Sequence, residues 1–288
     1  MIPSAHVDSF ARDNLPPREQ WPEFIFSLPE LNYPKRLNAA VELLDRAIER
    51  GHGGRPCVRS PNESLTYAEL AERANRIANV LTRDLGLVPG NRVLLRGPNS
   101  PAMVAAYFAV IKAGGVAVAT MPLLRAKELS YMVEKARISL ALCDARLSEE
   151  LEKTKPLAPS LQRVVYWGGG AADGLEALMA KTGYAAFTAC DTAQDDVCLI
   201  AFTSGTTGEP KGTMHFHRDL LATCDTYGKY VLRARADDVF IGSPPLAFTF
   251  GLGGLTLFPM RVGASTMLLE KTTPEDILAG IGDCRATI

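Results

Sequence analysis

The sequence lacks the features that mark membrane and nucleic-acid-binding proteins. Its 288 residues are 47% hydrophobic, yet no apolar run approaches the ~20 residues that cross a bilayer. A formal net charge of −1 gives no overall electrostatic attraction to nucleic acid or to an anionic membrane. The first residues carry Asp and Glu and do not resemble a secretory signal. We therefore expect a globular cytoplasmic protein without a nucleic-acid or membrane partner.

Metal-binding patterns are also missing. Histidine occurs four times, and only His215 and His217 lie close together, without a third ligand nearby. We expect them to form local hydrogen bonds, and we predict no metal-ligating residue. No two cysteines form a CxxC pair, so we expect buried thiols in a reducing compartment. The six cysteines are Cys57, Cys143, Cys190, Cys198, Cys224 and Cys284.

Strand and helix patterns alternate along most of the chain. Residues 1–35 are polar and rich in proline, which predicts an extended N-terminal arm. The alternation after it predicts an α/β fold of layered, mostly parallel sheets with helices. We divide this body into a first α/β subdomain over 36–190 and the start of a second over 191–288. Strands are expected over 56–60, 92–96, 115–120, 139–144, 163–167 and 197–202, and helices over 37–48, 66–85, 101–113, 127–135, 175–181 and 273–284.

Capping signals fix two of these helices. Thr66 followed by Glu69 is a capping box, and Gly86 stands where that helix should end. Thr273 is an N-cap residue with Pro274 at the first helical position. The last residues, 286–288, look like a strand that is beginning, which predicts that the chain is part of a longer protein.

A loop rich in glycine and hydroxyl groups follows the strand expected over 197–202. Residues 203–212 read TSGTTGEPKG, so backbone N–H groups, short hydroxyl donors and one lysine come together, as a polyphosphate requires. The spacing differs from GxxxxGK[ST], and no GxGxxG dinucleotide motif is present. From these residues alone, both an anion-binding loop and an unliganded flexible loop stay open.

This loop resembles the phosphate-binding signature of the adenylate-forming superfamily, which includes acyl- and aryl-CoA synthetases, luciferases and peptide adenylation domains. The signature runs [ST]-[SG]-G-[ST]-T-G-x-P-K-G, and every position fits. The resemblance implies that the loop cradles the β- and γ-phosphates of ATP and that Lys211 neutralises them and takes part in catalysis. The cradling residues are Thr203, Ser204, Gly205, Thr206, Thr207 and Gly208.

A second element of this superfamily is similar to residues 244–254, PPLAFTFGLGG. The resemblance places Phe248 at the aromatic position that gates the acyl site and gives it a catalytic role. Thr249, Phe250 and Gly251 would then lie against the carboxylate substrate, in a slot that suits a flat ring. The alternative is that Phe248 and Phe250 fill the core beside a helix.

The subgroup that the sequence most resembles is the benzoate- and 2-aminobenzoate-CoA ligases. The resemblance implies ATP, Mg²⁺ and coenzyme A as cofactor and co-substrates, an aromatic carboxylate as substrate, and an acyl-adenylate intermediate. It covers only the amino-terminal half of a typical member, with a partial large N-terminal domain, so we expect weak nucleotide binding and no useful turnover from this chain. The sequence allows a homodimer. A medium-chain acyl-CoA synthetase or other carboxylate-adenylating enzyme, and a non-catalytic nucleotide-binding module, remain alternatives.

Overall fold

The computed structural model describes residues 3–203 and 208–288 and contains two sheets. The six-stranded sheet has the order β6-β5-β3-β4-β7-β8, and the four-stranded sheet has the order β2-β1-β10-β9. The strands are β1 Pro56–Arg59, β2 Ser64–Thr66, β3 Arg92–Arg96, β4 Val116–Thr120, β5 Leu140–Asp144, β6 Arg163–Trp167, β7 Val197–Thr203, β8 Lys211–Phe216, β9 Val239–Ile241 and β10 Ser265–Met267.

Most strand pairs are parallel. In the larger sheet only β7 and β8 pair antiparallel, and in the smaller sheet only β1 and β2 do. Every residue of β3, β4 and β5 is buried, which explains why these segments read as nearly continuous apolar runs. The predicted α/β fold of mostly parallel sheets is confirmed.

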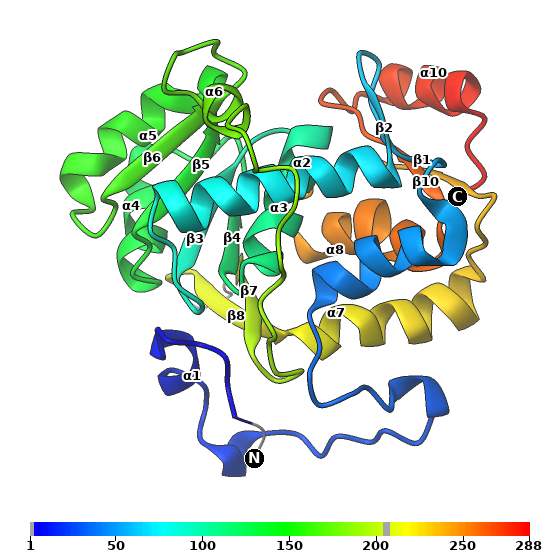
Figure 1. Ribbon diagram of the computed structural model, residues 1–288, viewed down its shortest axis with the longest axis horizontal. Coiled ribbons are helices and arrows are strands. Elements are labelled where there is room, and N and C mark those ends of the chain that lie inside the picture. The colour runs from blue at the N-terminus through cyan, green and yellow to red at the C-terminus, as the bar shows by residue number, and fades with distance from the viewer. Residues whose placement is uncertain (1–2, 204–207) are drawn as a thin grey trace.

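Helices cover both faces of the six-stranded sheet (Figure 1). Along β3, Val93 and Leu95 join the core formed with α2 and α3, whereas Leu94 joins the core on the α4 and α5 side. This alternation follows from the two-residue period of a strand. The helices are α1 Phe10–Asp13, α2 Tyr67–Asn79, α3 Pro101–Lys112, α4 Ala126–Lys135, α5 Ser148–Thr154, α6 Leu175–Met179, α7 His217–Thr223, α8 Thr249–Leu252, α9 Phe258–Val262 and α10 Pro274–Cys284. Wider π-helical turns continue α2 at Val80–Asp84, α7 at Cys224–Leu232 and α8 at Gly253–Leu257. Two further π-helical stretches are Val41–Asp45 and Ile48–His52.

Both predicted helix caps are present. The Thr66 hydroxyl accepts a hydrogen bond from the Glu69 N–H at 3.2 Å, and the Glu69 carboxylate accepts one from the Thr66 N–H at 2.8 Å. The Thr273 hydroxyl accepts from the Asp276 N–H at 3.2 Å. Each cap satisfies backbone donors that the first helical turn leaves unpaired.

Strands from both sides of residue 190 contribute to each sheet. Val58 of β1 lies opposite Thr266 of β10, and Ala117 of β4 lies opposite Leu199 of β7. The boundary that the sequence suggested at residue 190 therefore does not separate the two sheets, and the division into subdomains stays a prediction. Residues 286–288 form no regular strand, but Thr287 donates a backbone hydrogen bond to Val239 at 2.9 Å.

The N-terminal arm, dark blue in Figure 1, runs along one side of the body. The Asp196 carboxylate accepts hydrogen bonds from the Ser4 hydroxyl at 2.5 Å and from the Ala5 N–H at 3.0 Å. The buried Arg92 forms an ion pair with Asp8. The arm is therefore tied to the body by charged and polar contacts, although its described residues, from 3 onward, form only the short helix α1 and 3-10 turns at Arg18–Gln20 and Pro29–Leu31.

Candidate active site

The phosphate loop connects two paired strands. β7 ends at Thr203 and β8 begins at Lys211, and these two residues are opposite each other in the ladder. Both are exposed, and Gly208 has a φ of +125°, which favours glycine. Thr203, Gly208 and Lys211 therefore lie at the base of the loop. The remaining predicted phosphate ligands, Ser204, Gly205, Thr206 and Thr207, lie outside the described residues.

A tyrosine from helix α4 contacts the second half of the loop. The Tyr131 hydroxyl lies 3.0 Å from the Glu209 carboxylate and 3.2 Å from the Pro210 carbonyl, so it can donate to either. It accepts a hydrogen bond from the Lys135 ammonium at 2.7 Å. These hydrogen bonds connect Glu209 and Pro210, the two residues before Lys211, to helix α4.

A cavity of about 510 Å³ lies beside the two strands that carry this loop. It is largely apolar, with Phe250 and Thr249 from α8 on one side and His215 from β8 on another. Its size falls within the range of small-molecule pockets. The lining residues are Leu199, His215, Asp219, Leu220, Thr223, Tyr227, Thr249, Phe250, Leu252, Gly253, Leu257 and Phe258.

The four predicted substrate residues occupy different positions around this cavity. Phe250 is 74% exposed and lines the cavity, as does Thr249. Phe248 is 45% exposed, precedes α8 as its N-cap residue and is not among the lining residues. Gly251 is buried behind them. The alternative that Phe248 and Phe250 fill the core is therefore wrong.

The polar groups of the cavity were not predicted as substrate contacts. Asp219, Thr223 and Tyr227 follow one another at four-residue spacing along α7 and its continuation, so they share one helix face. That spacing is readable in the sequence, but only the fold shows that this face meets α8. Burial lowers the pKa of His215 and raises the pKa of Asp219. The cavity thus combines an aromatic wall with a neutral imidazole.

The second histidine of the pair has a separate structural role. His217 is fully buried, and its Nδ1 accepts a hydrogen bond from the Ala39 N–H at 3.1 Å. Desolvation lowers its pKa to about 3. The expected local hydrogen bonding is present for His215, whose Nε2 lies 3.3 Å from the Thr213 hydroxyl. It is wrong for His217, because its partner Ala39 is distant in the sequence.

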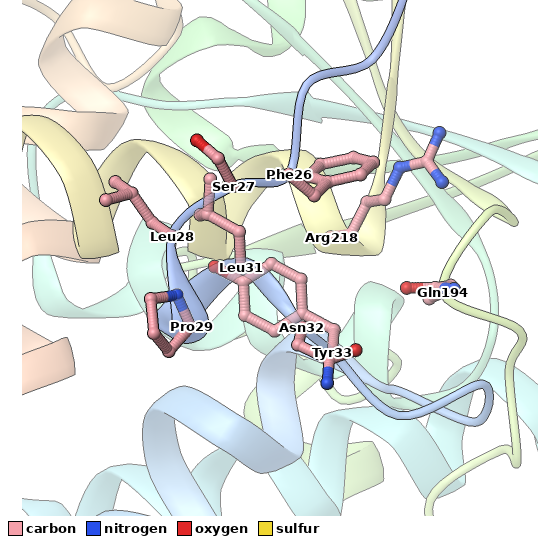
Figure 2. Close-up of a pocket in the computed structure, with 9 residues that line it drawn as sticks. All are labelled: Phe26, Ser27, Leu28, Pro29, Leu31, Asn32, Tyr33, Gln194 and Arg218. Carbon is pink, nitrogen blue, oxygen red and sulfur yellow. The ribbon is translucent and has the colours of Figure 1, made fainter.

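A second cavity, of about 330 Å³, lies between the arm and the start of α7 (Figure 2). Arm residues 26–29 and 31–33 form most of its wall, and Gln194 and Arg218 complete it. The Arg218 guanidinium lies over the rings of Phe24 and Phe26 at 4.8 and 5.5 Å. None of the predicted site residues lines this cavity, so it is separate from the candidate active site.

A hydroxyl- and glycine-rich sequence thus connects β7 and β8 beside an aromatic cavity. This arrangement is typical of α/β proteins that bind a nucleotide and, next to it, another small molecule. The AMP-binding enzyme family matches residues 44–288. The chain belongs to this family. Within the described residues, no helix is both long and apolar enough to span a membrane.

Relatives of this chain act on aromatic acids. It is 36% identical to the benzoate–CoA ligase of Thauera aromatica over 247 residues, which cover 85% of this chain and 47% of that protein. The structure is similar to that of the anthranilate CoA ligase AuaEII in complex with anthranoyl-AMP, with a TM-score of 0.84 and 27% identity, covering 90% of this chain and 49% of that one. It is also similar to a benzoate CoA ligase from Burkholderia xenovorans LB400, with a TM-score of 0.78 and 28% identity, covering 87% and 49%. The chain spans about half the length of these relatives. The predicted resemblance to benzoate- and 2-aminobenzoate-CoA ligases is confirmed.

Proposed function

We propose that this chain supplies the ATP-binding and acid-binding half of an ATP-dependent aryl-acid:CoA ligase. One observation carries the proposal: the aromatic cavity is lined by residues of β7 and β8, the two strands that hold the phosphate loop. An acid bound against Phe250 would lie next to a nucleotide bound by the loop. Relatives named as benzoate and anthranilate CoA ligases support an aromatic substrate.

The reaction has two steps. A carboxylate oxygen attacks the α-phosphorus of Mg-ATP, and pyrophosphate leaves with the electron pair of the broken P–O bond. The thiol of coenzyme A then attacks the acyl carbon of the adenylate, and AMP leaves. The protein mainly positions the reactants and neutralises charge. Lys211 and the hydroxyl groups of the loop would hold the pyrophosphate as its charge develops, with Mg²⁺ entering as part of the nucleotide substrate.

The cavity can select for a flat acid. Phe250, Phe258 and Tyr227 supply aromatic surface, and burial keeps His215 neutral at pH 7. Among the site residues, we assign phosphate binding to Thr203, Gly208, Lys211 and the loop between them, and acid binding to Thr249 and Phe250. We also propose gate motion by Phe248, a homodimer and a cytoplasmic location. The six cysteines are all free thiols, which supports the cytoplasmic location.

Direct binding tests the proposal on this chain. 2-Aminobenzoate is fluorescent, so a titration gives its affinity, and benzoate and octanoate can be added as competitors. We expect benzoate to displace the probe and octanoate not to. Phe250→Ala should weaken the binding of 2-aminobenzoate at least about fivefold, because an aromatic contact is lost, and should change the unfolding free energy by less than about 0.5 kcal/mol, because the side chain is largely exposed.

Other outcomes favour the alternatives. Displacement by octanoate rather than benzoate would support a medium-chain acyl-CoA synthetase. Binding of ATP without any acid would support a nucleotide-binding module. Exchange of labelled pyrophosphate into ATP, measured with benzoate and this chain, should stay at background, and exchange at ordinary rates would contradict the expectation that half of the enzyme has no useful turnover.

A further inference from the structure

We infer that Asn99 is a positioning residue that holds the acid-binding segment 244–251 in place, an inference that rests on the proposed function of the cavity. Asn99 lies in the short connection between β3 and α3 and is only 7% exposed. Its side-chain oxygen accepts a hydrogen bond from the Leu246 N–H at 2.7 Å, and its side-chain nitrogen donates one to the Pro244 carbonyl at 3.0 Å. The amide therefore binds the segment at two points, as a neighbouring strand would.

A second side chain from the same part of the chain completes this contact. The hydroxyl of Tyr107, on α3, donates a hydrogen bond to the Leu246 carbonyl at 2.9 Å in the buried core. Because eleven of the twelve residues of α3 are buried, this helix is a rigid support. The segment that precedes Phe248 is thus attached to the centre of the molecule.

The backbone hydrogen bonds of Pro244, Pro245 and Leu246 are all accounted for. The two prolines have no N–H to donate, so the three residues present four polar groups. Asn99 and Tyr107 bind three of them, and the fourth, the Pro245 carbonyl, accepts from the Phe248 N–H at 3.0 Å. Loss of Asn99 would leave the Leu246 N–H and the Pro244 carbonyl without these hydrogen bonds. This should be unfavourable, because buried backbone groups without partners are costly.

The consequence reaches the cavity through α8. The Phe248 carbonyl accepts from the Leu252 N–H at 2.8 Å, so the turn that starts at Pro245 continues into the helix that carries Thr249 and Phe250. Asn99 does not line the cavity, and neither do its hydrogen-bond partners Pro244 and Leu246. Its effect on the acid must therefore act through the position of this segment.

Hydrogen exchange of this chain tests the inference without any ligand. Asn99→Ala should accelerate amide exchange at 246–252 at least about tenfold, while exchange in β3 and β4 stays as in the unchanged chain. Asn99→Asp keeps the acceptor for Leu246 but places a carboxylate oxygen against the Pro244 carbonyl, so exchange at 246–252 should accelerate in this variant as well. The matched control is Asn38→Ala, because Asn38 is also 7% exposed and its side chain also bonds only to backbone groups, three of them, away from this segment.

The same variants are titrated with 2-aminobenzoate. We expect Asn99→Ala to weaken binding about tenfold and Asn38→Ala to leave it unchanged. Unchanged exchange at 246–252 in Asn99→Ala would overturn the inference, as would equal acceleration over the whole chain in both alanine variants. If the exchange pattern appears but the unchanged chain binds no aromatic acid, the positioning role stands and the proposed function fails.

Discussion

At the residue scale, the segment 244–251, which we propose to bind the acid, depends on a close backbone approach that only glycine permits. A Cβ atom at Gly251 would lie 2.1 Å from the Pro245 carbonyl oxygen. The first turn of α8 is therefore packed directly on the proline pair, with no room for a side chain. Gly254, three residues later on the same helical stretch, has no atom within 4 Å of such a Cβ.

These two glycines give a matched pair of substitutions. Gly251→Ala should lower the free energy of unfolding by about 1–3 kcal/mol, because the added methyl group forces α8 away from the prolines. Gly254→Ala should keep or slightly raise it, because alanine favours the helix. Urea denaturation measures both. Equal stability of the two variants would show that the turn at Pro245 yields without cost.

Individual residues also show how far the sequence predicts the site. The signature from Thr203 to Lys211 was recognisable because a phosphate site needs particular residue types in a fixed order. The cavity partners of Phe250 were not recognisable, since Tyr227 and Asp219 line the same cavity as Phe250 only in the folded chain. Contacts between distant segments are set by packing, which no local pattern records.

At the scale of single elements, caps and long apolar strands were predictable, and two partly buried elements were not. The box formed by Thr66 and Glu69 and the runs of β3 to β5 are local signals. Strand β8 was not predicted, because it pairs with β7 alone and is only partly buried, so it has no continuous apolar run. Helix α5 was also not predicted, since its sequence is mostly charged and only Leu151 and Thr154 are buried.

The contact between α4 and the phosphate loop leads to a prediction about nucleotide affinity. Tyr131→Phe removes the hydroxyl that reaches Glu209 and Pro210. We expect the affinity for ATP to fall about threefold to tenfold, since the end of the loop loses a fixed hydrogen bond. Calorimetric titration with ATP measures this.

The control is Tyr166→Phe. Tyr166 lies on β6, at the opposite edge of the sheet from β8, and its hydroxyl is bonded to Glu152 on α5. The affinity of this variant for ATP should equal that of the unchanged chain. If both variants bind ATP as tightly as the unchanged chain, the Tyr131 contact does not help position the loop.

The stability that the buried contact between His217 and the Ala39 N–H provides should depend on pH. Burial keeps His217 neutral, with a pKa of about 3, while its pKa in the unfolded chain is ordinary. The unfolded chain therefore binds an extra proton below pH 6.5, so the stability that neutral His217 provides is complete above that pH and is lost as the pH falls toward 3. Nearby Asp196 offsets part of the burial effect, and His6 adds to it.

The expected loss is about 2 kcal/mol of unfolding free energy between pH 7 and pH 5. His217→Asn retains an acceptor for the Ala39 N–H and cannot be protonated in this range, so its unfolding free energy should vary less with pH. Denaturation at pH 7, 6 and 5 gives the two slopes. Identical slopes would show that His217 does not control the acid sensitivity.

At the scale of the whole molecule, the chain folds back on itself rather than forming units in sequence order. Each sheet combines early and late strands, and the first residues bind Asp196. The order of elements along the chain could be predicted, but the pairing of early strands with late ones could not, because parallel neighbours in a sheet are not neighbours in sequence. The arm also lies against α7. The helical continuation of α7 carries Tyr227, which lines the same cavity as Phe250.

We therefore expect the arm to stabilise the position of α7. Phe24 and Phe26 stack with ring centroids 5.9 Å apart and lie against Arg218, whereas Ile25 between them is 74% exposed. Replacing both phenylalanines with alanine should release the arm and raise the rate of tryptic cleavage at Arg18 about tenfold, since two cation–π contacts are lost. Ile25→Ala should leave the rate unchanged, because that side chain points away from the body. Equal cleavage of all three proteins would mean that the polar contacts of Ser4, Ala5 and Asp8 hold the arm without the aromatic pair.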